Sequence, residues 1–197
     1  MLYELTQGGW IMLPLALCSL LAVTVIIERF LYFRRISGTG FAEQTLSLVT
    51  KGRLNEAMAA VKNSSRPLAK ILFAGLTNRQ EPAKAMEAAG AAELSTMKRG
   101  LPVLDTIITL SPLLGLLGTI IGMINSFHLM AASGLGEPHA VTGGVAEALI
   151  CTATGIAVAV ISLIPYNYFL ARIDRQTEVI EHYATRLELA LGLAPRE

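Results

Sequence analysis

SPLLGLLGTIIGMI, residues 111–124, is the stretch that decides the fold class of this chain. Glycine is a poor helix former in water and proline normally interrupts a helix, so this composition does not suit the core helix of a water-soluble protein. In lipid, by contrast, small residues allow helix backbones to approach closely. The residues of interest in this apolar run are Ser111, Pro112, Gly115, Gly118, Thr119 and Gly122.

Apolar residues make up 53% of the 197 residues and gather in blocks near 10–27, 106–131 and 145–170. Each block is about as long as the roughly 20 residues that a helix needs to cross a hydrocarbon core of about 30 Å. A soluble helical bundle would interrupt such runs with charges every few residues. The sequence therefore predicts an all-α integral membrane protein with three transmembrane helices.

Charge placement predicts the orientation of these helices. All 16 Lys and Arg residues lie in 29–99 or 172–196, and none lies in 1–10 or 131–144. The positive-inside rule then places the N-terminus outside and the C-terminus inside. The first helix has no basic segment before it and no small-x-small site after it, so we expect it to stay uncleaved. The predicted segments are a periplasmic 1–9, a transmembrane 10–33, a cytoplasmic helical region 34–102, a transmembrane 103–131, a periplasmic loop 132–143, a transmembrane 144–170 and a cytoplasmic helix 171–197.

Short amphipathic helices are expected between the first and second spans, at Phe41–Thr50, Arg53–Lys62 and Pro67–Thr77. From about residue 83 the pattern predicts one continuous helix to 131, with a kink at Gly100 and Pro102. The third span also continues past Phe169 with apolar residues at helical spacing. Two of the three long helices should therefore extend far into the cytoplasm.

Two spans each carry a stripe of small and hydroxyl residues when they are drawn at 100° per residue. Helix packing in lipid is one explanation of such stripes. The other explanation is that they line a passage or a socket for another helix. The stripes consist of Ser111, Gly115, Gly118, Thr119, Gly122 and Ser126 in the second span, and of Ala148, Thr152, Gly155, Ala159, Ser162 and Tyr166 in the third.

Ionisable groups in the spans are few and lie near the ends. Glu147 is about one turn into the third span, Asp105 is near the inner end of the second, and the Glu28–Arg29 pair ends the first. Interfacial pairing or snorkelling would explain each of them, least easily for Glu147. Threonine hydroxyls at mid-depth do not titrate. If protons cross here, another chain must supply the carboxylate, which predicts a hetero-oligomer.

Catalytic and metal-binding patterns are absent from the sequence. His128, His139 and His182 have no ligand-like spacing, and no HExxH, GxSxG or phosphate loop occurs. Cys18 and Cys151 fall inside predicted spans, where reduced packing residues are expected. We expect no cofactor, no metal, no enzyme activity and no nucleic-acid partner; the net charge of +1 by itself says nothing about nucleic acid.

Residues 111–127, SPLLGLLGTIIGMINSF, resemble the second-span signature of the MotA/TolQ/ExbB proton-channel family. GVAEALICTATGI at 144–156 is similar to its third-span signature, and residues 10–35 resemble the first span of ExbB-type members. Three spans fit ExbB and TolQ better than MotA. The resemblance implies a pentameric subunit of a bacterial inner-membrane motor, surrounded by lipid. Its pore would hold an ExbD- or TolR-like single-span partner whose aspartate carries the proton, and it would energise outer-membrane transport through a TonB-like protein.

The resemblance also implies roles for individual positions. Thr119 and Thr152 match pore-facing threonines, and Glu147 matches the family's third-span glutamate. Departures are Ser111 in place of an alanine, and Ile161 where a proline is common, with Pro165 one turn later. A TolQ-like role in envelope integrity and a non-conducting scaffold that clasps partner helices remain alternatives. The full set predicted to line the pore is Thr119, Thr152, Glu147, Ser111, Gly115, Gly122 and Gly155, with Asn167 and Asp105 at its inner end.

Overall fold

The computed structural model describes residues 10–36, 38, 40–133 and 138–193, and these residues form helices and short connections without a strand. The predicted all-α class is therefore confirmed. Contacts divide the chain into two units. The span unit comprises Met1–Glu28 and Gly100–Tyr168, and the bundle unit comprises Arg29–Arg99 and Phe169–Glu197. The predictions for residues 1–9, 134–137 and 194–197 concern residues that the structure does not describe.

Three helices of the described chain are long and apolar enough to cross a membrane, as the sequence predicted. They are α2 (Met12–Ile36), α7 (Leu101–Ser133) and α8 (Pro138–Leu193). Large apolar side chains such as Leu13, Leu20 and Ile164 are exposed on them. Exposed apolar surface of this extent suits lipid or partner helices. The orientation in a membrane and the span bounds, including the start of the third span at residue 144, stay predictions; the helix α8 itself begins at Pro138.

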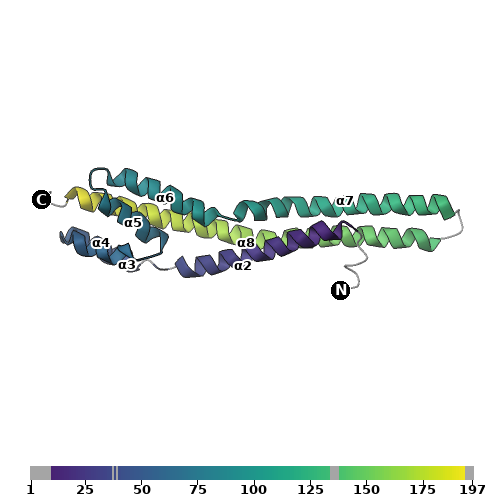
Figure 1. The fold of residues 1–197 in the computed structure, drawn as a ribbon, viewed down its shortest axis with the longest axis horizontal. Coiled ribbons are helices and arrows are strands. Elements are labelled where there is room, and N and C mark those ends of the chain that lie inside the picture. The colour runs from purple at the N-terminus through teal and green to yellow at the C-terminus, as the bar shows by residue number, and fades with distance from the viewer. Residues whose placement is uncertain (1–9, 37, 39, 134–137, 194–197) are drawn as a thin grey trace. The chain divides into compact units, whose positions relative to one another are not determined.

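The bundle unit contains four shorter helices, shown in Figure 1 with the C-terminal part of α8: α3 (Gly40–Thr50), α4 (Leu54–Lys62), α5 (Pro67–Thr77) and α6 (Pro82–Lys98). The first three confirm the predicted helices to within a residue. Pro67 and Pro82 begin α5 and α6 because proline is tolerated in the first turn of a helix. Gly52 makes the turn between α3 and α4 with a φ of 72°.

The predicted continuous helix from 83 to 131 is wrong, because α6 ends at Lys98 and α7 begins at Leu101. Gly100 lies between them with a φ of 80°, in the left-handed region that favours glycine. Pro102 falls in the first turn of α7, where its missing N–H costs no helical hydrogen bond. The predicted kink at Gly100 and Pro102 is therefore a full break.

The core of the bundle unit forms where α8 meets the short helices. Ile173, Ile180 and Leu187 are buried on α8 at intervals of seven residues, and Ile71 and Leu72 of α5 are completely buried. Seven-residue spacing keeps these side chains on one face of the helix. The Phe33 and Phe169 rings stack with centroids 5.6 Å apart and close this core at its other end. One face of α8 is therefore occupied by packing within the unit.

Candidate functional site

The small-residue stripes of α7 and α8 face each other within the span unit. The α7 stripe is buried at five glycine and serine positions, and the α8 stripe is buried around Gly155. Gly115 lies against Gly155, and Gly122 lies against Ala148, so the two helices run antiparallel. Buried stripe residues are Ser111, Gly115, Gly118, Gly122 and Ser126 on α7, and Ala148, Gly155, Ala159 and Ser162 on α8; Cys151 is buried beside them.

The helix backbones approach most closely at Gly115 and Gly155. A Cβ atom added to Gly155 would lie 2.5 Å from the Ser111 carbonyl oxygen and 3.1 Å from Gly115 Cα. A Cβ added to Gly115 would lie 3.0 Å from both the Cys151 carbonyl oxygen and Thr152 Cα. Real Cβ atoms are not found at 2.5 Å, so Gly155 requires glycine at this helix spacing, and at Gly115 a Cβ would fit only if the α8 backbone moved by a few tenths of an ångström.

The next two turns of α7 are also in close contact with α8. A Cβ on Gly118 would meet Cys151 Cβ at 2.6 Å, and one on Gly122 would meet Ala148 Cβ at 2.9 Å. The nearest neighbours of Gly118 are side-chain atoms of Cys151, whereas the neighbours of Gly115 and Gly155 are backbone atoms, and Gly122 also meets the Gly144 carbonyl oxygen at 3.1 Å. The interface between the two helices therefore extends over several turns and is tightest at the Gly115–Gly155 pair.

The hydroxyl groups of the two threonines have different partners. Thr152 Oγ1 donates a hydrogen bond to the Gly115 carbonyl oxygen at 3.0 Å, which links α8 to α7. Thr119 Oγ1 donates to the Leu116 carbonyl oxygen of its own helix at 2.7 Å. Thr119 is half-buried at the margin of the interface, and its oxygen keeps acceptor capacity. Thr152 therefore fixes helix spacing, and Thr119 is the more accessible hydroxyl.

Ser111 is completely buried beside Gly155, and its Oγ has no hydrogen-bond partner among the described atoms. A buried hydroxyl without a partner costs about 1–3 kcal/mol. Ser111 is also the residue that stands where the family that this chain resembles commonly has alanine. The hydroxyl is a polar group that the packing of α7 on α8 alone does not require.

The predicted site residues with charged or amide side chains lie away from the Gly115–Gly155 contact. Glu147 is half-buried on α8, one turn before Cys151. Asp105 is exposed on α7, and its carboxyl group faces the Tyr166 hydroxyl of α8. Asn167 is exposed on the adjoining turn. Asp105 and Asn167 thus lie toward one end of the paired helices, and Glu147 lies toward the other.

Arg29 is a residue whose position the sequence did not reveal. It is only 3% exposed, and its Nη1 donates to the Thr96 carbonyl oxygen at 3.0 Å and to that of Met97 at 3.5 Å. Both carbonyls belong to the last turn of α6, where the helix dipole favours a positive charge. Interfacial snorkelling does not describe this side chain. No local sequence pattern signals this contact, because the two carbonyl groups lie 67 and 68 residues away along the chain.

The predicted site residues thus fall into distinct groups. Ser111, Gly115, Gly122 and Gly155 come together with Thr152 in one helix interface, which is the geometry that helix packing requires. Thr119 lies at its margin, and the three polar end residues lie outside it. No cluster of metal-ligating side chains occurs in the described residues. Whether any of these residues line a pore stays a prediction, because a pore would need further chains.

Comparison with known proteins gives a consistent result. Residues 62–182 match the sequence model of the MotA/TolQ/ExbB proton channel family. An ExbB-like 3 protein of Synechocystis sp. is 36% identical over 190 residues, which cover 92% of this chain and 90% of that protein. The biopolymer transport protein exbB1 of Vibrio cholerae is 30% identical, over 94% of this chain and 86% of its own length. The Tol-Pal system protein TolQ of Pseudomonas aeruginosa is 41% identical over 46% of this chain and 39% of its own length.

Proposed function

Because the chain belongs to the MotA/TolQ/ExbB proton channel family, we propose that it is a proton-channel subunit of an inner-membrane motor. The motor would use the proton motive force to energise outer-membrane transport through a TonB-like protein. A membrane potential of 100 mV supplies about 2.3 kcal/mol for each charge that crosses. Several protons per cycle would therefore supply useful work.

The proposed arrangement in the membrane follows from charge. The span unit would cross the inner membrane with α2, α7 and α8, and the bundle unit, which carries all 16 Lys and Arg residues, would lie in the cytoplasm. The predicted spans 10–33, 103–131 and 144–170 contain only three acidic residues, Glu28, Asp105 and Glu147, and each lies near an end of its span. We infer that an ExbD- or TolR-like single-span partner, held in a ring of five copies of this chain, supplies the carboxylate at mid-depth.

The observation that carries this proposal is the difference between the two threonines. Thr119 is half-buried, donates only within its own helix and can accept a hydrogen bond from water or a partner. It is the hydroxyl that we assign to the proton pathway. Thr152, which donates to Gly115, would hold the helices at the spacing that presents Thr119.

Two alternatives have an observation in their favour. The buried contact between the α7 and α8 stripes supports a non-conducting scaffold, since packing alone explains those glycines. The similarity to a Tol-Pal system protein supports a TolQ-like role in envelope integrity. Complementation of a host that lacks both ExbB and TolQ distinguishes the TonB-linked role from the TolQ-like role. Recovery of TonB-dependent uptake supports the TonB-linked role, and recovery of detergent resistance alone supports the TolQ-like role.

The test of conduction is proton flux into liposomes that contain the chain and an ExbD-like partner. Thr119→Val keeps the side-chain shape, removes the hydroxyl and should abolish most of the flux while the complex still assembles. Thr119→Ser is the matched control, because it restores the hydroxyl. If Thr119→Val retains full flux, the proton-pathway role of Thr119 is wrong; if the native complex carries no flux, the scaffold alternative is correct.

A further inference from the structure

An apolar groove runs along the bundle unit between α6 and α8, with Ile71 of α5 in its lining and a volume of about 380 Å³. Its α6 wall is a single helical stripe, since the residues recur at intervals of three and four. From Ala83 to Leu94 this stripe spans about 16 Å at 1.5 Å per residue. The wall consists of Ala83, Met86, Glu87, Gly90, Ala91 and Leu94.

The groove wall on α8 is the helical face next to the buried core face. Ile180 is shared by both, being a core residue that also lines the groove. Ala184 on α8 and Gly90 on α6 line the groove with small residues, which leave room for the backbone of an occupant to approach. A Cβ atom added to Gly90 would have no neighbour within 4 Å. The surface therefore has room for a large occupant.

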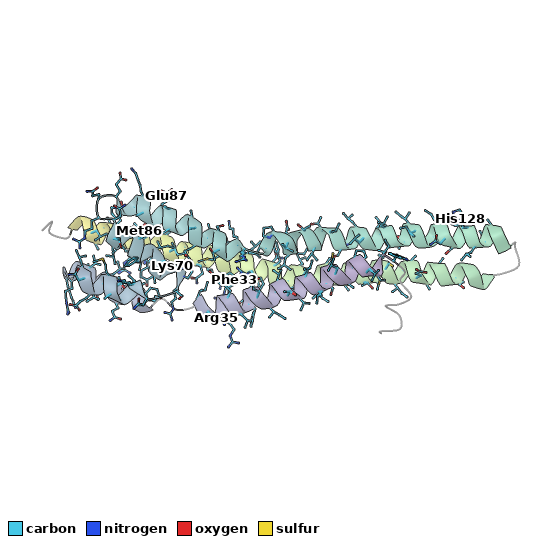
Figure 2. The ribbon with its side chains drawn as sticks, viewed as in Figure 1. Phe33, Arg35, Lys70, Met86, Glu87 and His128 are labelled. Carbon is cyan, nitrogen blue, oxygen red and sulfur yellow. The ribbon has the colours of Figure 1, made fainter. Side chains whose placement is uncertain are left out.

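Three carboxylates surround this apolar surface: Glu87 on α6, and Glu181 and Glu188 on α8. Figure 2 labels Glu87 beside Met86 on α6. All three are exposed, and within the described residues no salt bridge reaches any of them. Other glutamates of the same unit do have basic partners, as Glu43 has Arg186 and Glu93 has Lys70.

The lining includes no Lys or Arg, so the three negative charges lie within a short distance of one another without compensation. Such a surface concentrates a negative potential over roughly a Debye length of 8–10 Å. It repels anionic lipid headgroups and nucleic acid. It attracts a partner that brings apolar side chains for the floor and cationic side chains for the rim.

We propose that this groove binds a cationic amphipathic helix of a partner protein, of about three turns, with its apolar face on the groove floor and Lys or Arg beside Glu87, Glu181 and Glu188. Helix-in-groove recognition has this form, with apolar anchors at helical spacing and charged flanks. In the proposed membrane orientation the partner is cytoplasmic. The proposal concerns a surface of the bundle unit and is independent of proton conduction.

The binding test uses the full chain in neutral detergent micelles and a designed peptide of about 15 residues, long enough for measurable helicity. The peptide carries leucine on one face and lysine on its flanks, and a second peptide has glutamate in place of every lysine. We expect the lysine peptide to bind in a fluorescence anisotropy titration and to weaken as salt is raised. Equal binding of the glutamate peptide would overturn the proposal.

Variants locate the binding on the chain. The triple variant Glu87→Gln, Glu181→Gln, Glu188→Gln should weaken binding of the lysine peptide about tenfold, since three partly exposed pairs are lost. The matched control, Asp174→Asn with Glu178→Gln, removes exposed acids of α8 that do not line the groove and should leave affinity unchanged. An equal loss in both variants would show that general charge, not this groove, attracts the peptide.

A groove-filling variant tests the alternative that a second copy of this chain, and not a separate partner, occupies the groove. Gly90→Phe places a ring where a Cβ atom meets open space, so folding should be retained. We expect it to abolish peptide binding and to leave the oligomeric state, measured by native mass spectrometry, unchanged. If the oligomer dissociates instead, another copy occupies the groove, and the proposal of a separate cationic partner is wrong.

Discussion

Substitution of Gly155 by alanine tests how tightly α7 and α8 are held together. The new Cβ would lie 2.5 Å from the Ser111 carbonyl oxygen, about 0.9 Å inside the 3.4 Å at which ordinary contact begins. The neighbouring atoms of Ser111 and Gly115 belong to the backbone, so no side-chain rotation can relieve the contact. The helices must move apart, which also weakens the bond from Thr152 to Gly115.

The size of the effect follows from three contributions. Overpacking typically costs about 1–3 kcal/mol. An interhelical hydrogen bond in a membrane protein contributes about 0.6 kcal/mol. Alanine recovers about 1 kcal/mol of helix propensity relative to glycine. Together these contributions predict that Gly155→Ala destabilises the fold by about 0.6–2.6 kcal/mol, or roughly 1–10 °C in Tm for a chain of this size.

The assay is thermal unfolding in micelles, followed by the reaction of a fluorogenic maleimide with the buried thiols of Cys18 and Cys151. Gly143→Ala is the matched control, because Gly143 also lies in α8 and its added Cβ would meet nothing within 4 Å. That variant should unfold at the native temperature or slightly above it. Equal Tm values for the two alanine variants would refute the close approach of the helices.

Three further substitutions test other contacts. Arg29→Gln should lower stability by about 1–3 kcal/mol in the same thiol assay, because the last turn of α6 loses a charged donor, and Arg29→Lys should lose less. Gly100→Ala should cost about 1–2 kcal/mol, since alanine is strained at a φ of 80°. Arg186 lowers the pKa of Glu43 by hydrogen bonding, so the stability that this pair contributes is present above the ordinary glutamate pKa of 4.5 and is lost as the pH falls through the lowered value. The Tm difference between native protein and Glu43→Gln should therefore shrink in acid, and a difference that is independent of pH would contradict the pairing.

Local signals were sufficient for the short helices of the bundle unit. Gly52, Pro67 and Pro82 each mark a boundary through a backbone preference that acts within one or two residues. The α6–α7 break was missed because helix-forming residues continue on both sides of Gly100. A single glycine inside a helical pattern is often tolerated, and its positive φ here accompanies contacts from α2, where Val25 lies 3.1 Å from the position of an added Cβ.

The sequence was enough to predict which residues form the candidate site, but not which residues of the other helix they contact. Helical spacing collects Ser111, Gly115 and Gly122 on one face, yet it does not identify what that face meets. The pairing with Gly155 and the bond from Thr152 depend on the register between α7 and α8, which is set by packing along both helices. Burial of Arg29 likewise depends on the distant end of α6, and no local pattern carries that information.

The Gly115–Gly155 contact also determines which mutations a second mutation can repair. At Gly118 the obstacle to a larger residue is the side chain of Cys151, so shortening Cys151 to glycine would make room for alanine. At Gly155 the obstacle is the backbone of α7, and its partner Gly115 has no side chain to remove. A suppressor screen should therefore yield neighbouring compensations for Gly118→Ala, while any suppressor of Gly155→Ala has to act by altering the path of a whole helix.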